Sequence, residues 1–576
     1  MIRDMLWRYR RRFLVGAGLL LLTNGLALLI PLILREAIEA LRRGGGMTQA
    51  AHYAVLISLA ASARAVVRTG SRVAVLGASR RIAYDLRNRF FAHLLRLPVT
   101  FYSRTTTGDL MSRAVNDMMS VRSLFGPGLM NLFNTAMVYV SALAIMAWLN
   151  PLLTLASLVP LPFLIFAVQH IGSRLYTRSR AVQERLARLS EQAQESLSGI
   201  QMIKAHSQES REVETFRALC ETSRQANLSL ARVRGILIPL MGSLSGASGL
   251  IALWVGGRLV ARQDITLGDF VAFTGYLAML VWPTVAMGWI INSFQRGLVA
   301  IRRLEEILDQ PPEADVPTDP GAVQTLLGEI VFRRLTVSHE EGGPPALEDV
   351  SLRIRPGETV ALVGPIGSGK STIANILSRF VPVPDGTVFL DGRDINAIPL
   401  DVVRRHIGYV PQEAFLFART LKDNIAFGLD GSQPGEVERA AHLSGMERDL
   451  DLFPDGLETR VGEGGTTLSG GQRQRTTLAR AVALKPRILI LDDSLSSVDA
   501  RTEKEILENL SEVMAASTTL LISHRPAAVA WADRIVVLDR GRILEQGTHE
   551  ELMARNGLYA QMTRQRSLER SLETQP

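Results

Sequence analysis

The sequence contains almost no cysteine. Cys220 is the single cysteine among 576 residues, so the chain cannot close an internal disulfide and lacks the thiol pairs of a structural zinc site. We interpret Cys220 as a structural thiol, because nothing else in the sequence marks it as a reactive one.

Aromatic residues are also scarce, at 6% of the chain. Proteins that bind nucleic acid combine a basic face with stacking aromatic side chains, and the sequence has no basic segment with interleaved aromatics. We therefore attribute the formal net charge of +8 to arginines that flank membrane spans. The composition predicts no nucleic-acid partner.

Charge is missing altogether from several long segments, although 21% of all residues are charged and the mean hydropathy is +0.15. A helix needs about 20 apolar residues to cross the hydrocarbon core of a membrane. Residues 123–173 carry no formal charge, a length that allows two spans with a turn at Asn150 and Pro151. With the weaker segment Met47–Ala63 included, the sequence predicts six spans, at 13–34, at 47–63, two within 123–173, at 235–257 and at 270–295.

An even number of spans places both ends of the membrane half on the same side. Arg42 and Arg43 fall in the first outward loop and argue mildly against a cytoplasmic N-terminus. They are outnumbered by the arginines before the first span, which indicate that this side is the cytoplasm: Arg8, Arg10, Arg11 and Arg12. We predict a multi-pass protein of the cell (inner) membrane with its N-terminus and its soluble half in the cytoplasm.

The helical pattern continues beyond the membrane in two places. Residues 79–99 and 179–201 are polar, rich in arginine and low in glycine and proline, and each lies between two spans. They predict membrane helices that extend far into the cytoplasm.

Three arginines recur every four residues after the second predicted span. Arg64, Arg68 and Arg72 therefore share one face of a helix near the inner leaflet. Their guanidinium groups either reach the membrane surface with their long side chains or form the wall of a cavity that tolerates anionic or amphipathic cargo. Arg296, close to Asn292 and Gln295 of the last span, is a second group of this kind.

After residue 310 the composition changes. Residues 311–322 read PPEADVPTDPGA, which predicts a linker. Beyond it, short β-branched strands alternate with helices, an α/β pattern. We divide the chain into a transmembrane domain at 1–310, a linker at 311–326, an α/β domain at 327–565 and a polar tail at 566–576.

Two motifs of the α/β domain predict a nucleotide site. GPIGSGKS, residues 364–371, matches the phosphate-binding pattern G-x-x-x-x-G-K-[ST] between a predicted strand and a predicted helix. In RILILDD, residues 487–493, a buried strand delivers Asp492 to the magnesium ion of such a site. Ser371 is a further magnesium ligand, and the predicted ATP contacts are Gly364, Pro365, Ile366, Gly367, Ser368, Gly369, Lys370, Ser371 and Thr372.

The segment LSGGQ narrows the class of protein. It lies at the start of a predicted helix and resembles the signature of ATP-binding-cassette (ABC) proteins, carried by Leu468, Ser469, Gly470, Gly471 and Gln472. With this motif the soluble half resembles an ABC nucleotide-binding domain, and the six-span half resembles the transmembrane domain of an ABC exporter. The resemblance therefore covers nearly the whole chain.

The resemblance implies an all-α six-helix transmembrane domain followed by an α/β P-loop domain. It implies that the protein drives export of amphipathic or hydrophobic substrates, drugs or lipids, with ATP and Mg²⁺. It also implies a second half-transporter as partner, because family members sandwich ATP between the P-loop of one chain and the signature of the other.

Other family elements follow in the expected order. Gln412 resembles the glutamine that senses Mg²⁺ and the γ-phosphate, and His524 resembles the switch histidine. Asp499 resembles the residue of the D-loop, and Glu463 lies in a segment that resembles the exporter loop facing the cytoplasmic helix extensions. His339 occupies the position where the family normally stacks a tyrosine on adenine, so adenine stacking is expected to be weaker.

Two turns of the membrane half resemble those whose short coupling helices dock on nucleotide-binding domains. They are residues 101–117 and 195–209. By family geometry the second turn docks on the domain of the partner.

The residue after Asp492 departs from the family pattern. Family members usually carry Glu there to polarise the attacking water. Asp493 keeps the carboxylate but loses one methylene, which pulls the base back by roughly 1 Å and can cost about 100-fold in rate. The predicted catalytic residues are thus Asp493, His524 and Gln412, and the predicted magnesium ligands are Ser371, Gln412 and Asp492.

A weakened base combined with an intact signature resembles one half of a heterodimeric ABC exporter whose partner retains Glu. Two alternatives stay open. One is a homodimeric lipid flippase that runs on Asp493, and the other is an ATP-gated channel or regulatory membrane module.

Overall fold

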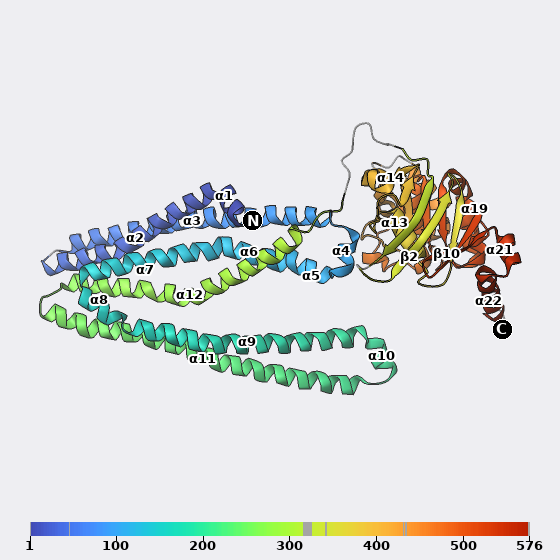
Figure 1. Ribbon diagram of the computed structural model, residues 1–576. Coiled ribbons are helices and arrows are strands. Elements are labelled where there is room, and N and C mark those ends of the chain that lie inside the picture. Colours follow the sequence, from blue (N-terminus) through green and yellow to red (C-terminus); the bar gives the residue numbers. More distant parts are fainter. Residues whose placement is uncertain are drawn as a thin grey trace. The chain divides into compact units, whose positions relative to one another are not determined.

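The computed structural model describes residues 2–44, 46–314, 325–339, 342–429, 431 and 435–573. The chain forms two compact units (Figure 1): Met1–Leu95 with Thr107–Gln310, and Arg96–Thr106 with Pro311–Pro576. Most of the predicted linker, 315–324, lies outside the described residues. The helix α22 runs through the start of the predicted tail to Glu573, and 574–576 lie outside the described residues.

The first unit is entirely helical among its described residues. Its elements are α1 (Ile2–Arg8), α2 (Arg10–Arg42), α3 (Met47–Leu94), α5 (Thr107–Ser112), the π-helical turn η1 (Arg113–Asp117), α6 (Met118–Ser123), the π-helical turn η2 (Leu124–Gly128), α7 (Leu129–Leu149), α8 (Pro151–Leu158), α9 (Pro160–Ser198), α10 (Ile200–Ala205), α11 (Glu209–Ala261) and α12 (Leu267–Leu308).

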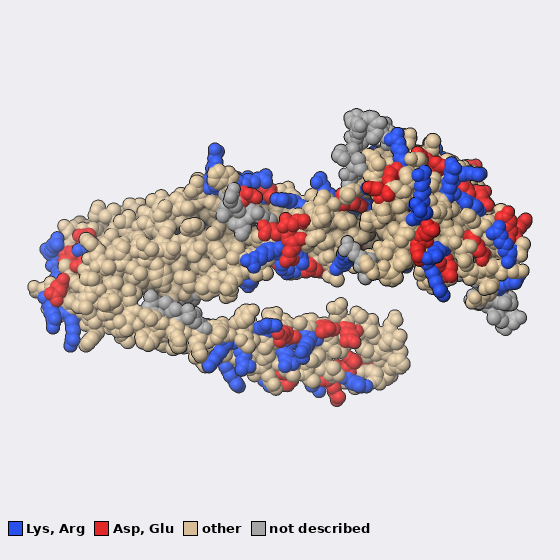
Figure 2. Space-filling model, in the orientation of Figure 1, with Lys and Arg blue, Asp and Glu red and all other residues tan. Residues whose placement is uncertain are grey.

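Five helices among the described residues are long and apolar enough to cross a membrane. They lie at Arg10–Arg42, Met47–Leu94, Thr107–Leu149, Gly242–Ala261 and Leu267–Leu308. On the face shown in Figure 2, a broad band of this unit with almost no charged side chains separates two charged ends. The weaker segment Met47–Ala63 thus lies in a helix that can span a membrane.

The fourth predicted span corresponds to α8 and the start of α9, where several side chains lie outside the described residues. The turn predicted before it is present. Asn150 ends α7 and caps α8, because its Oδ1 accepts a hydrogen bond from Leu153 N at 2.9 Å, and Pro151 is the first helical residue. A proline at this position loses no helical hydrogen bond.

The predicted cytoplasmic extensions are helical. Residues 79–94 belong to α3, and α9 continues to Ser198, where α10 turns the chain into α11. Figures 1 and 2 show α9 and α11 side by side as a long arm that stands apart from α2, α3, α7 and α12 over its distal half.

The helices α2 and α3 pack closely near the start of α2. Gly16 permits this approach, since a Cβ there would lie 2.4 Å from Val75 Cγ2. The Ser71 hydroxyl donates to Gly16 O at 3.3 Å. Because α3 runs antiparallel to α2, this contact sets how far along α2 the residues that precede Ser71 lie.

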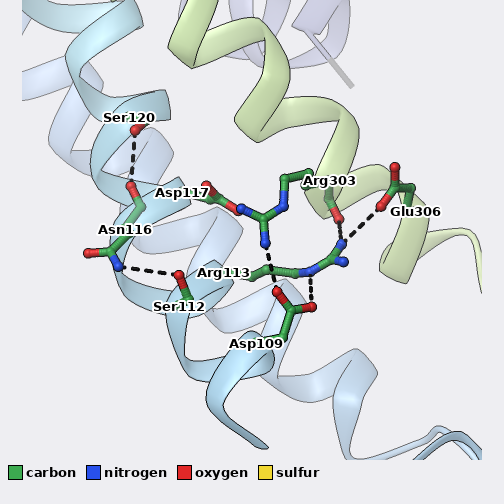
Figure 3. A network of polar contacts seen from close by, with 8 residues as sticks. All are labelled: Asp109, Ser112, Arg113, Asn116, Asp117, Ser120, Arg303 and Glu306. Carbon is green, nitrogen blue, oxygen red and sulfur yellow. Dashed lines mark hydrogen bonds and ion pairs between the residues drawn. The ribbon is translucent and has the colours of Figure 1, made fainter. Parts of the chain in front are cut away.

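A network of charged side chains joins α5 and η1 to the end of α12 (Figure 3). Arg113 pairs with Asp109 at 2.7 Å and with Glu306 at 3.1 Å. Arg303 pairs with Asp109 at 2.7 Å and with Asp117 at 3.2 Å. Since each arginine bridges two carboxylates, the network holds the helix that follows residue 106 against α12.

The second unit contains α4 (Val99–Arg104) and an α/β domain. Glu313 N donates to Arg96 O at 2.7 Å, so the chain just before α4 contacts the segment that leads into the α/β domain. Of the first predicted coupling turn, the part up to Thr106 thus groups with this unit and the part from Thr107 with the helical unit.

The α/β domain has two sheets. The smaller, antiparallel sheet has the order β2-β1-β4-β5, and the larger has the order β10-β9-β3-β8-β7-β6 with β9, β3, β8, β7 and β6 parallel. Every residue of β3, β7 and β8 is buried, which explains why aliphatic residues make up most of these strands. The strands are β1 (Ile330–Ser338), β2 (Pro345–Ile354), β3 (Thr359–Val363), β4 (Val388–Leu390), β5 (Arg393–Asp394), β6 (Ile407–Val410), β7 (Ile488–Asp492), β8 (Thr518–Ile522), β9 (Arg534–Asp539) and β10 (Arg542–Gly547).

Helices pack around these sheets. They are α13 (Lys370–Leu377), α14 (Leu400–His406), α15 (Leu421–Ile425), α16 (Glu436–Leu443), α17 (Glu447–Leu450), α18 (Gly470–Ala483), α19 (Ala500–Ala516), α20 (Pro526–Val529), α21 (His549–Arg555) and α22 (Leu558–Glu573).

Candidate nucleotide-binding site

The predicted site residues follow four neighbouring strands of the larger sheet. The phosphate loop follows β3, His524 follows β8, Asp492 ends β7, and Gln412 comes two residues after β6. Because these strands are parallel and adjacent, their carboxyl ends lie at one edge of the sheet. This is the edge where α/β proteins bind ligands.

The phosphate loop depends on glycine at both ends. Gly364 has φ +155°, and a Cβ there would lie 2.0 Å from Leu538 O. Gly369 has φ +99°, and a Cβ there would lie 2.8 Å from Ala346 O. Because α13 starts directly after Gly369, its first backbone N–H groups point into the loop, an arrangement that attracts phosphate.

Lys370 places a cation inside this loop. Its Nζ donates to Gly364 O at 2.9 Å, to Pro365 O at 2.7 Å and to Ser368 Oγ at 3.3 Å. The side chain is only 7% exposed. The ammonium group is thus held inside the loop by two backbone carbonyl oxygens. From this position it can contact a phosphate bound in the loop.

Ser371 and Asp492 come together from α13 and β7. The Ser371 hydroxyl donates to Asp492 Oδ1 at 3.3 Å. Burial raises the pKa of the Asp492 carboxyl and the nearby Asp493 raises it further, whereas the hydrogen bond from Ser371 and the charge of Lys370 lower it. A buried carboxylate with a raised pKa gains from a cation beside it.

This pair suits a magnesium ion. A hydroxyl and a carboxylate are hard oxygen ligands, and Mg²⁺ commonly takes one or two protein carboxylates together with substrate phosphates. Among the described residues no three His, Cys, Asp or Glu side chains group as a metal site.

Asp493 lies at the turn that follows β7. Its N–H donates to Ile522 O at 2.8 Å, its carbonyl accepts from Ser496 N at 3.2 Å, and its φ is +44°. Among residues other than glycine, Asp and Asn adopt this left-handed conformation most readily. The backbone of Asp493 is thus held at the carboxyl ends of both β7 and β8.

His339 reaches the phosphate loop from the end of β1. Its Nε2 lies 3.3 Å from the Thr372 hydroxyl on α13. Ile366, Gly367 and Gln412 are exposed. His524 is half-buried directly after β8.

The signature residues form the start of α18. Ser469 caps the helix in a reciprocal pair with Gln472: Ser469 Oγ accepts from Gln472 N at 3.2 Å, and Gln472 Oε1 accepts from Ser469 N at 2.9 Å. Leu468 is buried, whereas Ser469 is exposed. The capping leaves Gly470 and Gly471 in the first turn, where their N–H groups can face an anion.

Asp499 caps the next helix. Its Oδ1 accepts hydrogen bonds from Arg501 N and Thr502 N, each at 3.1 Å. Hydrogen bonds from Thr502, first from its side chain and then from its backbone, lower the pKa of the Asp499 carboxyl. Asp499 therefore fixes the junction between the loop 493–499 and α19.

The sequence analysis missed two residues that hold this loop. Gln474 Nε2 donates to Ser496 Oγ at 3.1 Å, and Gln474 Oε1 accepts from Ser497 N at 3.0 Å. Gln474 thereby ties the signature helix to the loop after Asp493. The only sequence signal for this role of Gln474 was a glutamine on a face of the predicted helix that otherwise carries small and apolar residues.

Arg525 is the second of these residues and follows His524 directly. Its guanidinium donates to Ser496 O at 2.7 Å, to Val498 O at 2.7 Å and to Glu503 Oε2 at 2.6 Å. Glu503 is 2% exposed. Arg525 therefore joins the segment after β8 to the loop that carries Asp499.

We expect Arg525→Ala to destabilise the α/β domain by about 3–5 kcal/mol, since it leaves the Glu503 carboxylate buried without its cation. For a domain of this size that loss lowers the melting temperature by roughly 10 °C. Fluorescence-detected melting of the solubilised protein measures it. Arg439→Ala, at an exposed position of α16, serves as control and should shift melting little. Equal melting of the two variants would contradict the role given to Arg525.

Comparison with known proteins supports the fold and identifies the family. Residues 13–284 match the family model of the ABC transporter transmembrane region, and residues 347–496 match that of the ABC transporter. A probable multidrug resistance ABC transporter ATP-binding/permease protein of Bacillus subtilis is 37% identical over 97% of this chain and 96% of its own length. An ATP-dependent lipid A-core flippase of Nitrosococcus oceani is 34% identical over 84% of this chain and 81% of its own length.

Among solved structures, a bacterial Atm1-family ABC exporter with ATP bound matches 96% of this chain and 99% of its own, with 28% identity and a TM-score of 0.80. The predicted order of a helical transmembrane domain and an α/β nucleotide-binding domain is confirmed. The chain belongs to the ABC transporters, as a fused transmembrane and ATP-binding half-transporter of the exporter fold whose ATPase is coupled to transport.

Proposed function

We propose that this chain is one half of a heterodimeric ABC exporter that moves amphipathic or hydrophobic molecules, drugs or lipids, out through the inner membrane. The relatives named for multidrug resistance and for lipid flipping support this range of cargo. The proposal of a heterodimer rests on Asp493. This residue is one methylene shorter than the usual Glu and lies beside an otherwise complete set of nucleotide-binding residues.

In this proposal the loop residues 364–372 bind the phosphates of ATP, and His339 contributes beside the adenine. Ser371, Asp492 and Gln412 would hold Mg²⁺, which would supply positive charge to the transferring phosphoryl group. His524 and Gln412 position the γ-phosphate and the attacking water. The signature residues 468–472 and Asp499 complete the second site, whose phosphate loop belongs to the partner.

Asp493 accepts the proton of the attacking water. Its carboxylate is one methylene shorter than Glu, and a displacement of about 1 Å can cost about 100-fold in rate. No other contact of the nucleotide depends on that methylene. The site on this chain therefore binds ATP tightly and hydrolyses it slowly, while the partner's site hydrolyses most of the ATP.

The helical unit supports a dimer. The distal arm of α9, α10 and α11 exposes large apolar side chains: Tyr176 69%, Leu186 48%, Leu197 73% and Met202 68%. Leu186 and Leu197 lie in the predicted polar extension 179–201, and Met202 lies in α10 directly after it. A second half-transporter that packs against the arm removes this surface from water.

The membrane orientation follows from charge. Arginines before the first span keep the N-terminus and the ATP-binding domain in the cytoplasm. ATP closes the two nucleotide-binding domains, the coupling turns transmit the closure to the spans, and hydrolysis resets them. A homodimeric lipid flippase is the second candidate, favoured by the likeness to the lipid A-core flippase.

Purification alone and with a partner tests the proposal. We expect this chain by itself, in liposomes, to hydrolyse ATP about 100-fold more slowly than the pair formed with a half-transporter that carries Glu at the corresponding position. Phosphate release measures both rates, and uptake of a fluorescent amphiphile into inverted vesicles measures transport.

A chain that alone hydrolyses ATP and transports as fast as the pair would contradict the heterodimer and support the homodimeric flippase. Nucleotide-dependent ion current without uptake of any amphiphile would instead support the channel alternative. A partner variant with Gln in place of its catalytic Glu is the control, because transport that persists in it contradicts hydrolysis by the partner.

A further inference from the structure

A small cavity lies inside the helical unit, where the junction of α8 and α9 meets α11 and α12. It has a volume of about 30 Å³ and is lined mainly by apolar side chains, with hydroxyl groups at Ser157, Ser245, Ser248 and Thr284. A water molecule needs roughly 10–15 Å³ of such space. The cavity is therefore large enough for a water molecule and far too small for a drug or a lipid tail.

Ser157 brings a polar group without a partner into this cavity. The residue is 0% exposed, and its Oγ has no hydrogen-bond partner among the described residues. Other hydroxyls of these helices do have one, since Thr154 and Thr284 each donate to the carbonyl oxygen four residues earlier at 2.8 Å. A buried hydroxyl that lacks a partner costs stability, so Ser157 favours a polar ligand in the cavity.

Two prolines remove main-chain donors at the same place. Pro160 has no N–H for Ala156 O, and Val159 N donates to that oxygen instead, at 3.3 Å. Pro162 likewise has no N–H for Leu158 O, so this carbonyl loses its regular helical donor. Leu158 lines the cavity. Inside a membrane, carbonyl oxygens freed by proline are satisfied by hydroxyl groups or by ordered water.

The facing helices add further hydrogen-bonding groups. Ser248 of α11 and Thr284 of α12 are both buried. The Thr284 hydroxyl donates to Leu280 O and also bonds to Tyr139 OH, so its second lone pair can still accept a hydrogen bond. A buried water molecule typically has about three polar partners. Ser157, the carbonyl of Leu158 and the hydroxyls of α11 and α12 can supply that number.

We propose that this cavity binds a water molecule that joins α8 to α11 and α12 at the proline break. The water accepts a hydrogen bond from Ser157 Oγ and donates to Leu158 O and to a hydroxyl of a facing helix. It thereby replaces the main-chain hydrogen bond that Pro162 removes. The inference goes beyond the proposed export function and does not depend on it, because it concerns a binding site within one chain.

X-ray hydroxyl-radical footprinting of the full-length protein tests the site, because radiolysis of a bound water oxidises the side chains beside it. Leu280 lines the cavity and is 3% exposed, so radicals from bulk solvent do not reach it. We expect Leu280 to be oxidised several-fold more than Leu304, which is buried on the same helix away from the cavity. Ser157→Ala removes the donor and should bring the oxidation of Leu280 down to that of Leu304.

Thermal melting gives a second readout, whose sign depends on the water. If water satisfies Ser157, the Ala variant loses a net favourable hydrogen bond, and its melting temperature should fall by about 2–4 °C. A hydroxyl without a partner would instead destabilise the wild type, and its removal would raise the melting temperature. Ser79→Ala is the matched control, because this buried hydroxyl already donates to Leu76 O at 2.9 Å and does not line the cavity.

Three results would overturn the inference. The first is oxidation of wild-type Leu280 that does not exceed that of Leu304. The second is a Ser157→Ala variant that melts higher than the wild type. The third is an equal loss of Leu280 oxidation in Ser157→Ala and Ser79→Ala, because the signal then reports general loosening of the helices rather than a water at Ser157.

Discussion

Asp493→Glu is expected to raise ATP hydrolysis at this chain's own nucleotide site by about 100-fold. The substitution restores the missing methylene and returns the carboxylate to the attacking water, where a 1 Å displacement can cost that factor. The residues that bind the nucleotide are unchanged, so the apparent affinity for ATP should stay the same and kcat should rise.

The measurement must isolate one of two sites. In a dimer whose partner carries Gln in place of its catalytic Glu, the remaining phosphate release comes from the site built on Asp493. Asp455→Glu, which adds the same methylene at an exposed turn, is the matched control. An Asp493→Glu rate equal to that of the control would show that the length of this carboxylate does not limit hydrolysis.

The same substitution has a cost in stability, which comes from the backbone conformation at Asp493. Its φ of +44° is adopted more readily by Asp than by Glu, and a left-handed residue costs of order 1–2 kcal/mol. The cost falls on the stability of the turn, which Ile522 and Ser496 hold by backbone hydrogen bonds. We therefore expect Asp493→Glu to melt slightly lower than wild type while it hydrolyses faster.

The sequence predicted those parts of the fold that depend on local pattern. The buried strands β3 and β7 each contain four consecutive aliphatic residues, 360–363 and 488–491. The loop between Gly364 and Gly369 is a backbone motif that needs glycine at set positions. The turn at Asn150 and Pro151 was likewise readable, because a capping Asn before Pro starts a helix.

Contacts between distant side chains could not be predicted in this way. Arg525 bonds to Ser496 and Val498 only because β8 and β7 are neighbours in the sheet, an order that no local pattern reveals. Gln474 meets Ser497 for the same reason.

The sequence also predicted the positions of the spans better than the residues at which the helices begin and end. The sequence from Thr107 to Leu149 continues through the π-helical turns η1 and η2, where extra residues are absorbed without ending the helix. The fourth predicted span is divided between α8 and α9 at Val159, because Pro160 cannot donate a helical hydrogen bond.

Lys370→Ala is expected to lower the ATP affinity of this chain's site by at least about 100-fold. The ammonium group is the cation that charge-assisted contacts to the β- and γ-phosphates require, and two such contacts are worth about 3–6 kcal/mol. It also bonds to Gly364 O, Pro365 O and Ser368 Oγ, so its removal loosens the loop itself. Photolabelling with 8-azido-ATP, followed by separation of the two subunits, reports binding at each site.

The same variant tests whether a slow site still matters for transport. If ATP held at this chain's loop helps to close the dimer, Lys370→Ala abolishes transport although the partner retains its catalytic Glu. Lys504→Ala removes an exposed lysine that pairs with Glu508 one turn away, and such pairs contribute little, so labelling and transport should stay at wild-type levels. Undiminished labelling of Lys370→Ala would mean that the loop between β3 and α13 does not bind the nucleotide. Lost labelling with normal transport would mean that this half contributes no closing energy, because the partner's ATP alone then drives the cycle.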